Sequence, residues 1–305
     1  MEFLNRIKSL LGQKGGDRSK TKLRRSKKVR IATRFEIKRA AIHGTMSSFF
    51  MARDLESGKT IGLKVGDGEK VAMFEARFKG LNKPPEGEIA AGMHHPLIVE
   101  TYEYGLTTEG LPYIVMEYVN GMGMQLYVHN RDPILEGRRV HLVRQMAEAV
   151  SHVHKAGFIH RDVCPRNFIC NAEVDSLKLI DFGLTLPYTK EFMQPGNRTG
   201  TPLYMAPEIV RRKWTDQRVD VFAMGVTAYH TITYELPWPV TEMSGLAALA
   251  HDTHPPKEIL EYRPKLDKRV ARTIMKCLEP DPKNRLESLE VFLREIRDVK
   301  EDDDE

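Results

Sequence analysis

The stretch HRDVCPRN at residues 160–167, followed by DFG at residues 181–183, decides the interpretation of this 305-residue chain. The first stretch combines an acid, an amide and cations, and the second places another acid beside a glycine. Phosphoryl transfer needs a carboxylate to orient the attacking hydroxyl group, and oxygen ligands to hold a divalent cation against the phosphates. Asp162 fits the first role, and Asn167 and Asp181 fit the second.

Three further segments follow downstream in a fixed order. Residues 200–208 read GTPLYMAPE, and residues 281–285 read DPKNR. Between them, the stretch that begins DVFAMG at residue 220 is almost wholly apolar. A helix that is apolar on all faces belongs in a core. Two surface turns that carry acids by chance would not be followed by this series, so we reject that alternative.

Together these motifs resemble those of the protein kinase family, over roughly residues 35 to 298. The resemblance implies an α+β, two-lobed protein kinase fold: a small antiparallel β lobe with one regulatory helix, and a larger, mostly helical lobe. It also implies that Arg285 pairs with Glu208 of the A-P-E motif. Asp220 would support the catalytic loop from below.

The resemblance assigns the central roles residue by residue. Asp162 accepts or orients the substrate hydroxyl, and Asn167 and Asp181 hold Mg²⁺. Lys64, in the apolar stretch IGLKV at residues 61–65, corresponds to the lysine that pairs with the phosphates of ATP. An ordinary exposed lysine in a strand is the alternative for Lys64.

The glycine-rich loop of the family falls at residues 42–49, IHGTMSSF. Its pattern is G-x-G-x-x-G-x-V, and only the middle glycine is present, as Gly44. Ile42 and Ser47 occupy the places of the other two. Because glycine lets backbone N–H groups approach phosphates closely, we expect Gly44 to contribute to ATP binding.

The acidic partner of Lys64 is less certain from the sequence. Apolar side chains at helical spacing predict a helix that Pro84 and Pro85 end: they are Val71, Phe74, Phe78 and Leu81. A second helical stretch runs over residues 86–93. Counting back from the family's H-P-x-I-V motif gives Glu86 as the partner, with Glu88 and Glu75 as alternatives.

The segment YIVMEYV at residues 113–119 resembles the family's fifth strand and hinge. The resemblance implies that Met116 flanks the adenine pocket and that the Glu117 and Val119 backbones hydrogen-bond the base. Ile169 would line the same pocket. A buried strand without a ligand is the alternative.

Residues in and near the catalytic loop indicate whether the acceptor hydroxyl belongs to serine or threonine, or to tyrosine. Serine/threonine kinases place a lysine two residues after the catalytic acid, where this chain has Cys164. Arg166 stands where tyrosine kinases carry an arginine, but Thr201, seven residues before Glu208, matches the serine/threonine form. We therefore expect a serine/threonine kinase in which Arg166 replaces the missing lysine, unless Arg166 only pairs with a surface acid. Cys164 is expected to be a small, partly buried thiol, and a redox-sensitive thiolate is the alternative.

The charge is unevenly distributed. Residues 1–30 hold eleven Lys or Arg and two acids, a net of +9, whereas the whole chain carries +5. We predict that residues 1–34 form a basic, disordered arm with a short amphipathic start. The kinase domain then covers residues 35–298 (35–119 small lobe and hinge, 120–298 large lobe), and residues 299–305 form an acidic tail. The arm is either a solvated tail, a docking segment for an anionic membrane or a partner, or, least favoured, a nucleic-acid contact.

Three cysteines are too few for a disulfide framework, and neither a signal peptide nor an apolar run of membrane-spanning length is evident. We therefore expect a cytoplasmic protein, with peripheral membrane attachment through the arm as a further option. The sequence as a whole predicts an ATP- and Mg²⁺-dependent serine/threonine protein kinase of a bacterial branch. A pseudokinase scaffold and a small-molecule phosphotransferase are the alternatives.

Overall fold

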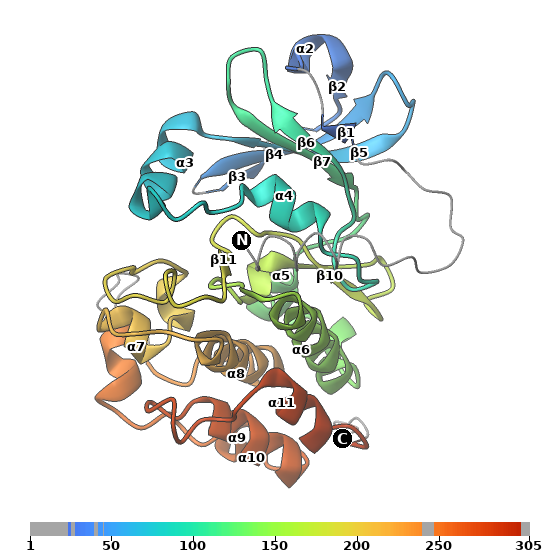
Figure 1. The fold of residues 1–305 in the computed structure, drawn as a ribbon. Helices are drawn as coiled ribbons and strands as arrows, with labels where there is room; N and C mark the ends of the chain where they lie inside the picture. The colour runs from blue at the N-terminus through green and yellow to red at the C-terminus, as the bar shows by residue number, and fades with distance from the viewer. Residues whose placement is uncertain (1–23, 26–27, 40–41, 45, 240–246, 300–305) are drawn as a thin grey trace. The chain divides into compact units, whose positions relative to one another are not determined.

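The computed structural model describes residues 24–25, 28–39, 42–44, 46–239 and 247–299. The chain divides into two units (Figure 1). The described residues up to Val71, together with residues 87–94 and 100–118, make up the first unit. The second unit consists of residues 72–86, 95–99 and the described residues from Val119 onward.

The first unit is built on a sheet that has seven strands in the described part of the chain. Its strand order is β1 (Arg24–Arg25), β6 (Thr101–Leu106), β7 (Pro112–Glu117), β5 (Thr60–Gly66), β4 (Ser47–Asp54) and β2 (Phe35–Ile37), and β3 (Ile42–His43) also pairs with β4. All pairs are antiparallel except β1 with β6. The buried core comprises Phe35, Ala52, Ile61, Leu63, Tyr113 and Val115. The expected antiparallel β lobe is therefore confirmed.

Residues at the end of the expected arm, which we bounded at residue 34, contact this sheet. β1 pairs with β6, and Val29 forms a bridge with Thr107 and packs against the core. In the short helix α2 (Ile31–Arg34), the guanidinium of Arg34 forms two hydrogen bonds to Glu103, at 2.7 and 2.8 Å. The basic composition of this segment predicted that it is solvated, but the charge of Arg34 is paired with acidic side chains of the sheet. The predicted amphipathic start lies outside the described residues.

Two helical stretches separated by the prolines are present as predicted, but the first ends at Phe78 and does not include Leu81. α3 (Gly68–Glu75) continues into the 3₁₀ turn η1 (Ala76–Phe78), and α4 (Glu86–Ala91) begins after the two prolines. Gly87 in α4 lies against β6, because a Cβ atom at Gly87 would lie 2.5 Å from the Cβ of Tyr104. A side chain at position 87 would therefore force this turn of α4 away from the sheet.

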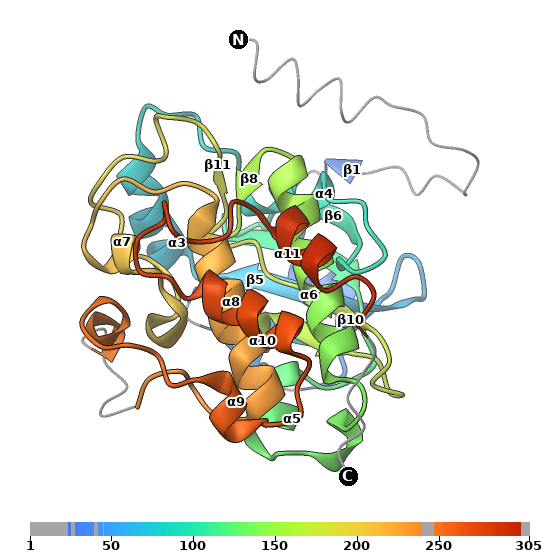
Figure 2. The same ribbon diagram turned by 90° about the horizontal axis from the view of Figure 1, so that it is seen from below.

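The second unit is mainly helical. Its longer helices are α6 (Arg139–Lys155), α8 (Arg218–Thr233), α10 (Lys268–Cys277) and α11 (Leu289–Glu295), which pack side by side (Figure 2). Shorter helices are α5 (Met124–His129), α7 (Pro207–Val210) and α9 (Ile259–Tyr262). Two small antiparallel pairs join β8 (Phe158–Ile159) to β11 (Leu186–Pro187) and β9 (Phe168–Cys170) to β10 (Leu177–Leu179). The 3₁₀ segments are η2 (Pro133–Leu135), η3 (Pro165–Asn167), η4 (Pro202–Tyr204) and η5 (Ala247–Asp252).

The central helix of this unit is α8, which is buried along almost its whole length, as its apolar sequence predicts.

At the C-terminal end of the described residues, Val299 is buried, and the Arg144 guanidinium donates hydrogen bonds to the carbonyls of Ile296 and Val299. Val299, which we assigned to the acidic tail, therefore packs on the helical unit. Residues 300–305 lie outside the described residues.

Candidate active site

The catalytic loop starts at His160, directly after β8, and its backbone is fixed by the buried carboxylate of Asp220 in α8. The His160 and Arg161 amides donate to this carboxylate at 2.7 and 2.8 Å, and His154 Nε2 lies 2.9 Å from it. Burial opposes ionisation, but the His154 contact and the amide hydrogen bonds hold the pKa of Asp220 below its ordinary value. The expected support from Asp220 is confirmed.

Arg161 adopts a left-handed backbone conformation, with φ at 69°. Such a conformation costs an ordinary residue about 1–3 kcal/mol, and the hydrogen bond from its amide to Asp220 offsets this cost. Its buried guanidinium donates to the Asn197 carbonyl at 3.0 Å and to the Thr215 hydroxyl at 3.4 Å. Burial lowers the pKa of Arg161 to about 10, against the attraction of Asp220. The arginine remains charged at neutral pH and links the loop to residues downstream.

The carboxylate of Asp162 receives hydrogen bonds at both oxygens. Oδ1 accepts from the Thr201 amide at 2.9 Å and from the Thr201 hydroxyl at 2.6 Å. Oδ2 accepts from Asn167 Nδ2 at 3.0 Å and from Arg166 Nη2 at 3.1 Å. Four of the residues predicted from the sequence therefore meet here: Asp162, Arg166, Asn167 and Thr201. Their hydrogen bonds fix the plane of the carboxylate.

Asn167 and Asp181 present oxygen ligands. Asn167 Nδ2 donates to both the backbone and the side chain of Asp162, so its Oδ1 is the atom turned away from that residue. Asp181 Oδ1 accepts from the Gly183 amide at 2.8 Å. No group of three or more His, Cys, Asp or Glu gathers at one point among the described residues. Mg²⁺ is commonly bound through one or two carboxylates together with substrate phosphates, and this donor set suits that pattern.

Cys164 is fully buried beside Thr201, with its Sγ 3.7 Å from the threonine hydroxyl. Burial, reinforced by Asp162, raises the pKa of the thiol to about 12. The reactive species of a cysteine is the thiolate, which is disfavoured here. The structure therefore supports the interpretation of Cys164 as an inert buried thiol, and it speaks against the redox-sensitive alternative.

Arg166 lies within the catalytic loop, in η3, with about half of its side chain exposed. Burial of the remainder opposes the charge, but attraction to Asp162 raises the pKa of the guanidinium. The sequence left open whether Arg166 pairs with a surface acid. The acid is Asp162 itself, so the guanidinium lies next to the carboxylate that we expect to orient the acceptor.

The predicted nucleotide residues of the first unit lie on its sheet. The buried Lys64 on β5 stands opposite Ile114 of β7 and Phe49 of β4. Met116 on β7 stands opposite Gly62, where a Cβ atom would lie 3.0 Å from the Met116 side chain. Gly44 closes the turn between β3 and β4, because its amide donates to the Ser47 carbonyl at 2.8 Å. Glu117 ends β7.

Val119 and Ile169 belong to the second unit, where glycines let the linker after β7 approach β9. Gly123 forms an antiparallel bridge with Ile169, and the Cys170 amide donates to the Met122 carbonyl at 3.0 Å. A Cβ atom at Gly121 would lie only 1.7 Å from the Cys170 carbonyl oxygen. Any other residue at position 121 would break this pairing, which the sequence did not reveal.

Of the three candidate partners for Lys64, Glu86 is partly buried at the start of α4, whereas Glu75 and Glu88 are exposed. A further cation, Lys83, was missed by the sequence analysis. Burial lowers its pKa, while Glu75 and Glu86 act in the opposite direction. Its ammonium group also lies 5.5 Å from the centre of the Phe74 ring. The pairing of Lys64 with Glu86 stays a prediction.

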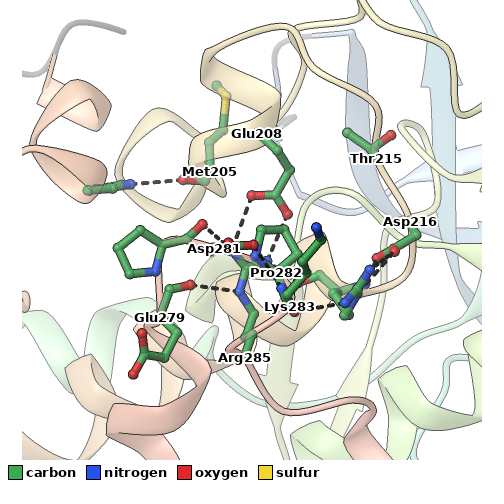
Figure 3. A network of polar contacts seen from close by, with 12 residues as sticks. Met205, Glu208, Thr215, Asp216, Glu279, Asp281, Pro282, Lys283 and Arg285 are labelled. Carbon is green, nitrogen blue, oxygen red and sulfur yellow. Dashed lines mark hydrogen bonds and ion pairs between the residues drawn. The ribbon is translucent and has the colours of Figure 1, made fainter.

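A buried ion pair closes the segment that carries Thr201 (Figure 3). The Arg285 guanidinium binds both carboxylate oxygens of Glu208, at 2.7 and 3.1 Å. Its remaining N–H groups donate to backbone carbonyls, those of Glu279, Pro280 and Arg218. A buried guanidinium needs such complete pairing, because an unpaired buried charge is costly. The predicted Arg285–Glu208 pair is confirmed.

Comparison with known proteins identifies the class. The model of the protein kinase domain matches residues 36–295, and the chain belongs to the protein kinase family. Its relatives include the serine/threonine-protein kinase pkn3 of Myxococcus xanthus, 31% identical over 285 residues. They also include the serine/threonine-protein kinase PknB of Mycolicibacterium smegmatis, 31% identical over 270 residues, and that of Mycobacterium tuberculosis, 31% identical over 268 residues. The expected resemblance to bacterial, eukaryotic-like serine/threonine kinases is thus confirmed.

The matches cover most of this chain but only part of the relatives. They span 88% of the chain and 50% of pkn3, and 85% of the chain and 41% of each PknB. The chain thus spans half or less of the length of these relatives. Within its described residues, no helix has both the length and the apolar character needed to cross a membrane.

Proposed function

We propose that this chain is a protein kinase that transfers the γ-phosphate of ATP to serine or threonine hydroxyls of protein substrates, with Mg²⁺ as the metal. The observation that carries the proposal is the carboxylate of Asp162, whose two oxygens are held by Thr201, Asn167 and Arg166. Family membership and the names of the relatives support the same activity.

Asp162 would accept a hydrogen bond from the acceptor hydroxyl and direct its oxygen at the phosphorus. Because Thr201 binds Asp162 through both its amide and its hydroxyl, the segment after Gly200 is tied to the catalytic carboxylate. That segment leads directly into the A-P-E motif. The serine/threonine preference rests on Thr201 and on the relatives.

Asn167 and Asp181 would hold Mg²⁺ through hard oxygen atoms. When bound, the metal neutralises charge on the phosphates. Lys64 would position the same phosphates, with Glu86 as its acidic partner. On the base, Met116, Ile169 and the backbones of Glu117 and Val119 are the proposed contacts, and Gly44 is the proposed contact of the glycine-rich loop, in which the other two glycines are replaced.

Arg166 would supply the cation that a lysine at position 164 provides elsewhere in the family. The transferred group carries its charge on its outer oxygens, so a neighbouring cation stabilises the transition state. The guanidinium is anchored at Asp162 by one nitrogen and offers several further donors. Cys164, buried and protonated, supplies no charge.

Phospho-amino-acid analysis tests the proposal. The full chain is incubated with Mg²⁺ and γ-labelled ATP, alone and with generic protein substrates, and the labelled products are hydrolysed. We expect phosphoserine and phosphothreonine. Label found only in phosphotyrosine would contradict the acceptor assignment. No label in any product, together with retained nucleotide binding, would instead support a pseudokinase.

A further inference from the structure

Two histidines contact the short segment that carries Thr201: the half-buried His230 and the buried His251. The Tyr204 hydroxyl lies 2.8 Å from Nδ1 of His230 on α8. The next residue, Met205, accepts a hydrogen bond at its backbone carbonyl from Nδ1 of His251, also at 2.8 Å. Figure 3 shows the Met205 carbonyl turned toward its partner, away from the Glu208 carboxylate. Both ends of the η4 turn, Thr201 and Met205, are therefore held by side chains from elsewhere in the unit.

The chemistry of the Met205 contact fixes the state of His251. A backbone carbonyl only accepts hydrogen bonds, so Nδ1 must carry the proton. His251 is 2% exposed. Burial lowers its pKa, against the opposing effects of the Met205 hydrogen bond and the neighbouring Asp252. A neutral ring with the proton on Nδ1 satisfies the contact.

Packing holds the His251 ring in this position. Its centroid lies 4.4 Å from that of Trp238 and 5.5 Å from that of Phe222. The Arg285 guanidinium lies 5.0 Å from the centre of the Phe222 ring, and it is the group that binds Glu208. The stack therefore joins the buried ion pair to the His251 ring.

A second contact joins the η5 segment to the chain after the A-P-E motif. Asp252, next to His251 in η5, binds the Arg211 guanidinium with both oxygens, at 2.8 and 2.9 Å. Arg211 directly follows α7. The η5 segment is therefore attached to the chain both before and after the A-P-E motif.

We infer that His251 is a positioning residue for the protein acceptor. It touches neither Asp162 nor the proposed metal ligands in the described contacts, and it acts through the Met205 carbonyl. The turn from Thr201 to Met205 is short, with the Tyr204 amide bonded to the Thr201 carbonyl at 2.9 Å. A shift of Met205 would therefore be transmitted to Thr201, which is bound to Asp162. This inference rests on the proposed kinase activity.

The test compares variants that separate the ring from its donor. His251→Phe keeps an aromatic ring in the stack but removes the N–H group, leaving the Met205 carbonyl without its donor. In His251→Asn the amide nitrogen falls close to the place of Nδ1, whereas in His251→Gln it falls beyond it. We expect the KM for an acceptor peptide to rise about tenfold in the Phe and Gln variants, the effect of one buried group left without its partner. The Asn variant should stay within about threefold of wild type.

One control distinguishes positioning from general damage. The KM for ATP should remain unchanged in all three variants, because ATP binding does not involve the segment from Thr201 to Met205. An unchanged peptide KM in both the Phe and Gln variants, or an equal rise of the KM for ATP and the KM for the peptide, would overturn the inference. If His251→Phe fails to fold, the Asn and Gln pair decides alone. A wild-type chain that phosphorylates no peptide would remove the kinase proposal and this inference with it, whereas an active wild type with unaffected variants removes only the inference.

Discussion

At the scale of single residues, the site depends on side chains that fix one another. Asp162 is oriented by donors from η3 and from Thr201, and the backbone before it is held by Asp220. The sequence indicated Asp162, Asn167, Arg166 and Thr201 through motif spacing, and the structure brings these four together. The sequence did not indicate His251, because the partner of His251 is a backbone carbonyl 46 residues away. Such a pairing leaves no local pattern.

The first residue-scale prediction concerns Arg166. Arg166→Ala should lower kcat roughly tenfold to a thousandfold, the range for losing one good charge-stabilising contact. Arg166→Lys, which keeps the charge but not the planar donors, should recover part of that loss. Steady-state kinetics with saturating ATP measure both variants. If the alanine variant kept the wild-type kcat, the guanidinium would have no part in the transition state.

The second residue-scale prediction concerns Asp220 and pH. Its folded-state pKa is below the ordinary value. The carboxylate therefore stabilises the fold fully above its ordinary pKa, and this contribution is lost as the pH falls toward the folded value. We expect Asp220→Asn to be less stable than wild type at pH 7 and the difference to narrow from about pH 5 to about pH 2. Chemical denaturation across this range measures it, with the exposed Glu287→Gln as control. A constant difference would contradict the assignment.

At the scale of elements, local signals predicted some features and not others. The burial of α8 follows from its composition, whereas the helical stretch expected to run up to Pro84 already ends at Phe78. The attachment of the residues before β2 could not be predicted, because it depends on Glu103, an acid 69 residues from Arg34. The close approach at Gly121 was missed for a similar reason, since the obstructing atom belongs to Cys170.

The element-scale prediction concerns this attachment. Arg34 and Glu103 are largely buried, and the Tyr113 hydroxyl also donates to Glu103 at 2.5 Å. Arg34→Met leaves the carboxylate buried without its cation, which should cost about 3 kcal/mol of unfolding free energy. The exposed pair of Lys38 with Glu36 provides the control, since Lys38→Met should change stability little. Equal effects of the two substitutions in urea titrations would show that the Arg34 pair does not stabilise the sheet.

At the scale of the whole molecule, the fold class and family followed from motifs spread along the chain. For the basic segment before β2, charge composition predicts a solvated arm, whereas its described residues pair with the sheet. Residues 24–25 and Val29 pair with the edge of the sheet, and residues 1–23 lie outside the described residues. We propose that this arm docks on an anionic membrane surface, to which each nearby Lys or Arg adds ~1 kcal/mol.

The whole-molecule prediction compares two truncations. Deleting residues 1–23 should leave activity on a peptide nearly unchanged. Deleting residues 1–30 should lower stability, because it removes β1 and Val29 from the sheet. Only the full-length chain should pellet with anionic vesicles at low salt, and this binding should weaken as salt screens the charges. Equal pelleting of the full-length chain and the chain lacking residues 1–23 would exclude docking through residues 1–23.

The most direct test of the central claim is the rate of phosphoryl transfer by Asp162→Asn, measured beside its Mg²⁺-dependent binding of ATP. Asn keeps the shape of the side chain but removes the charge that orients the acceptor hydroxyl. We predict that transfer to a peptide falls to background while ATP binding stays close to the wild-type value. Transfer by Asp162→Asn at the wild-type rate would contradict the account.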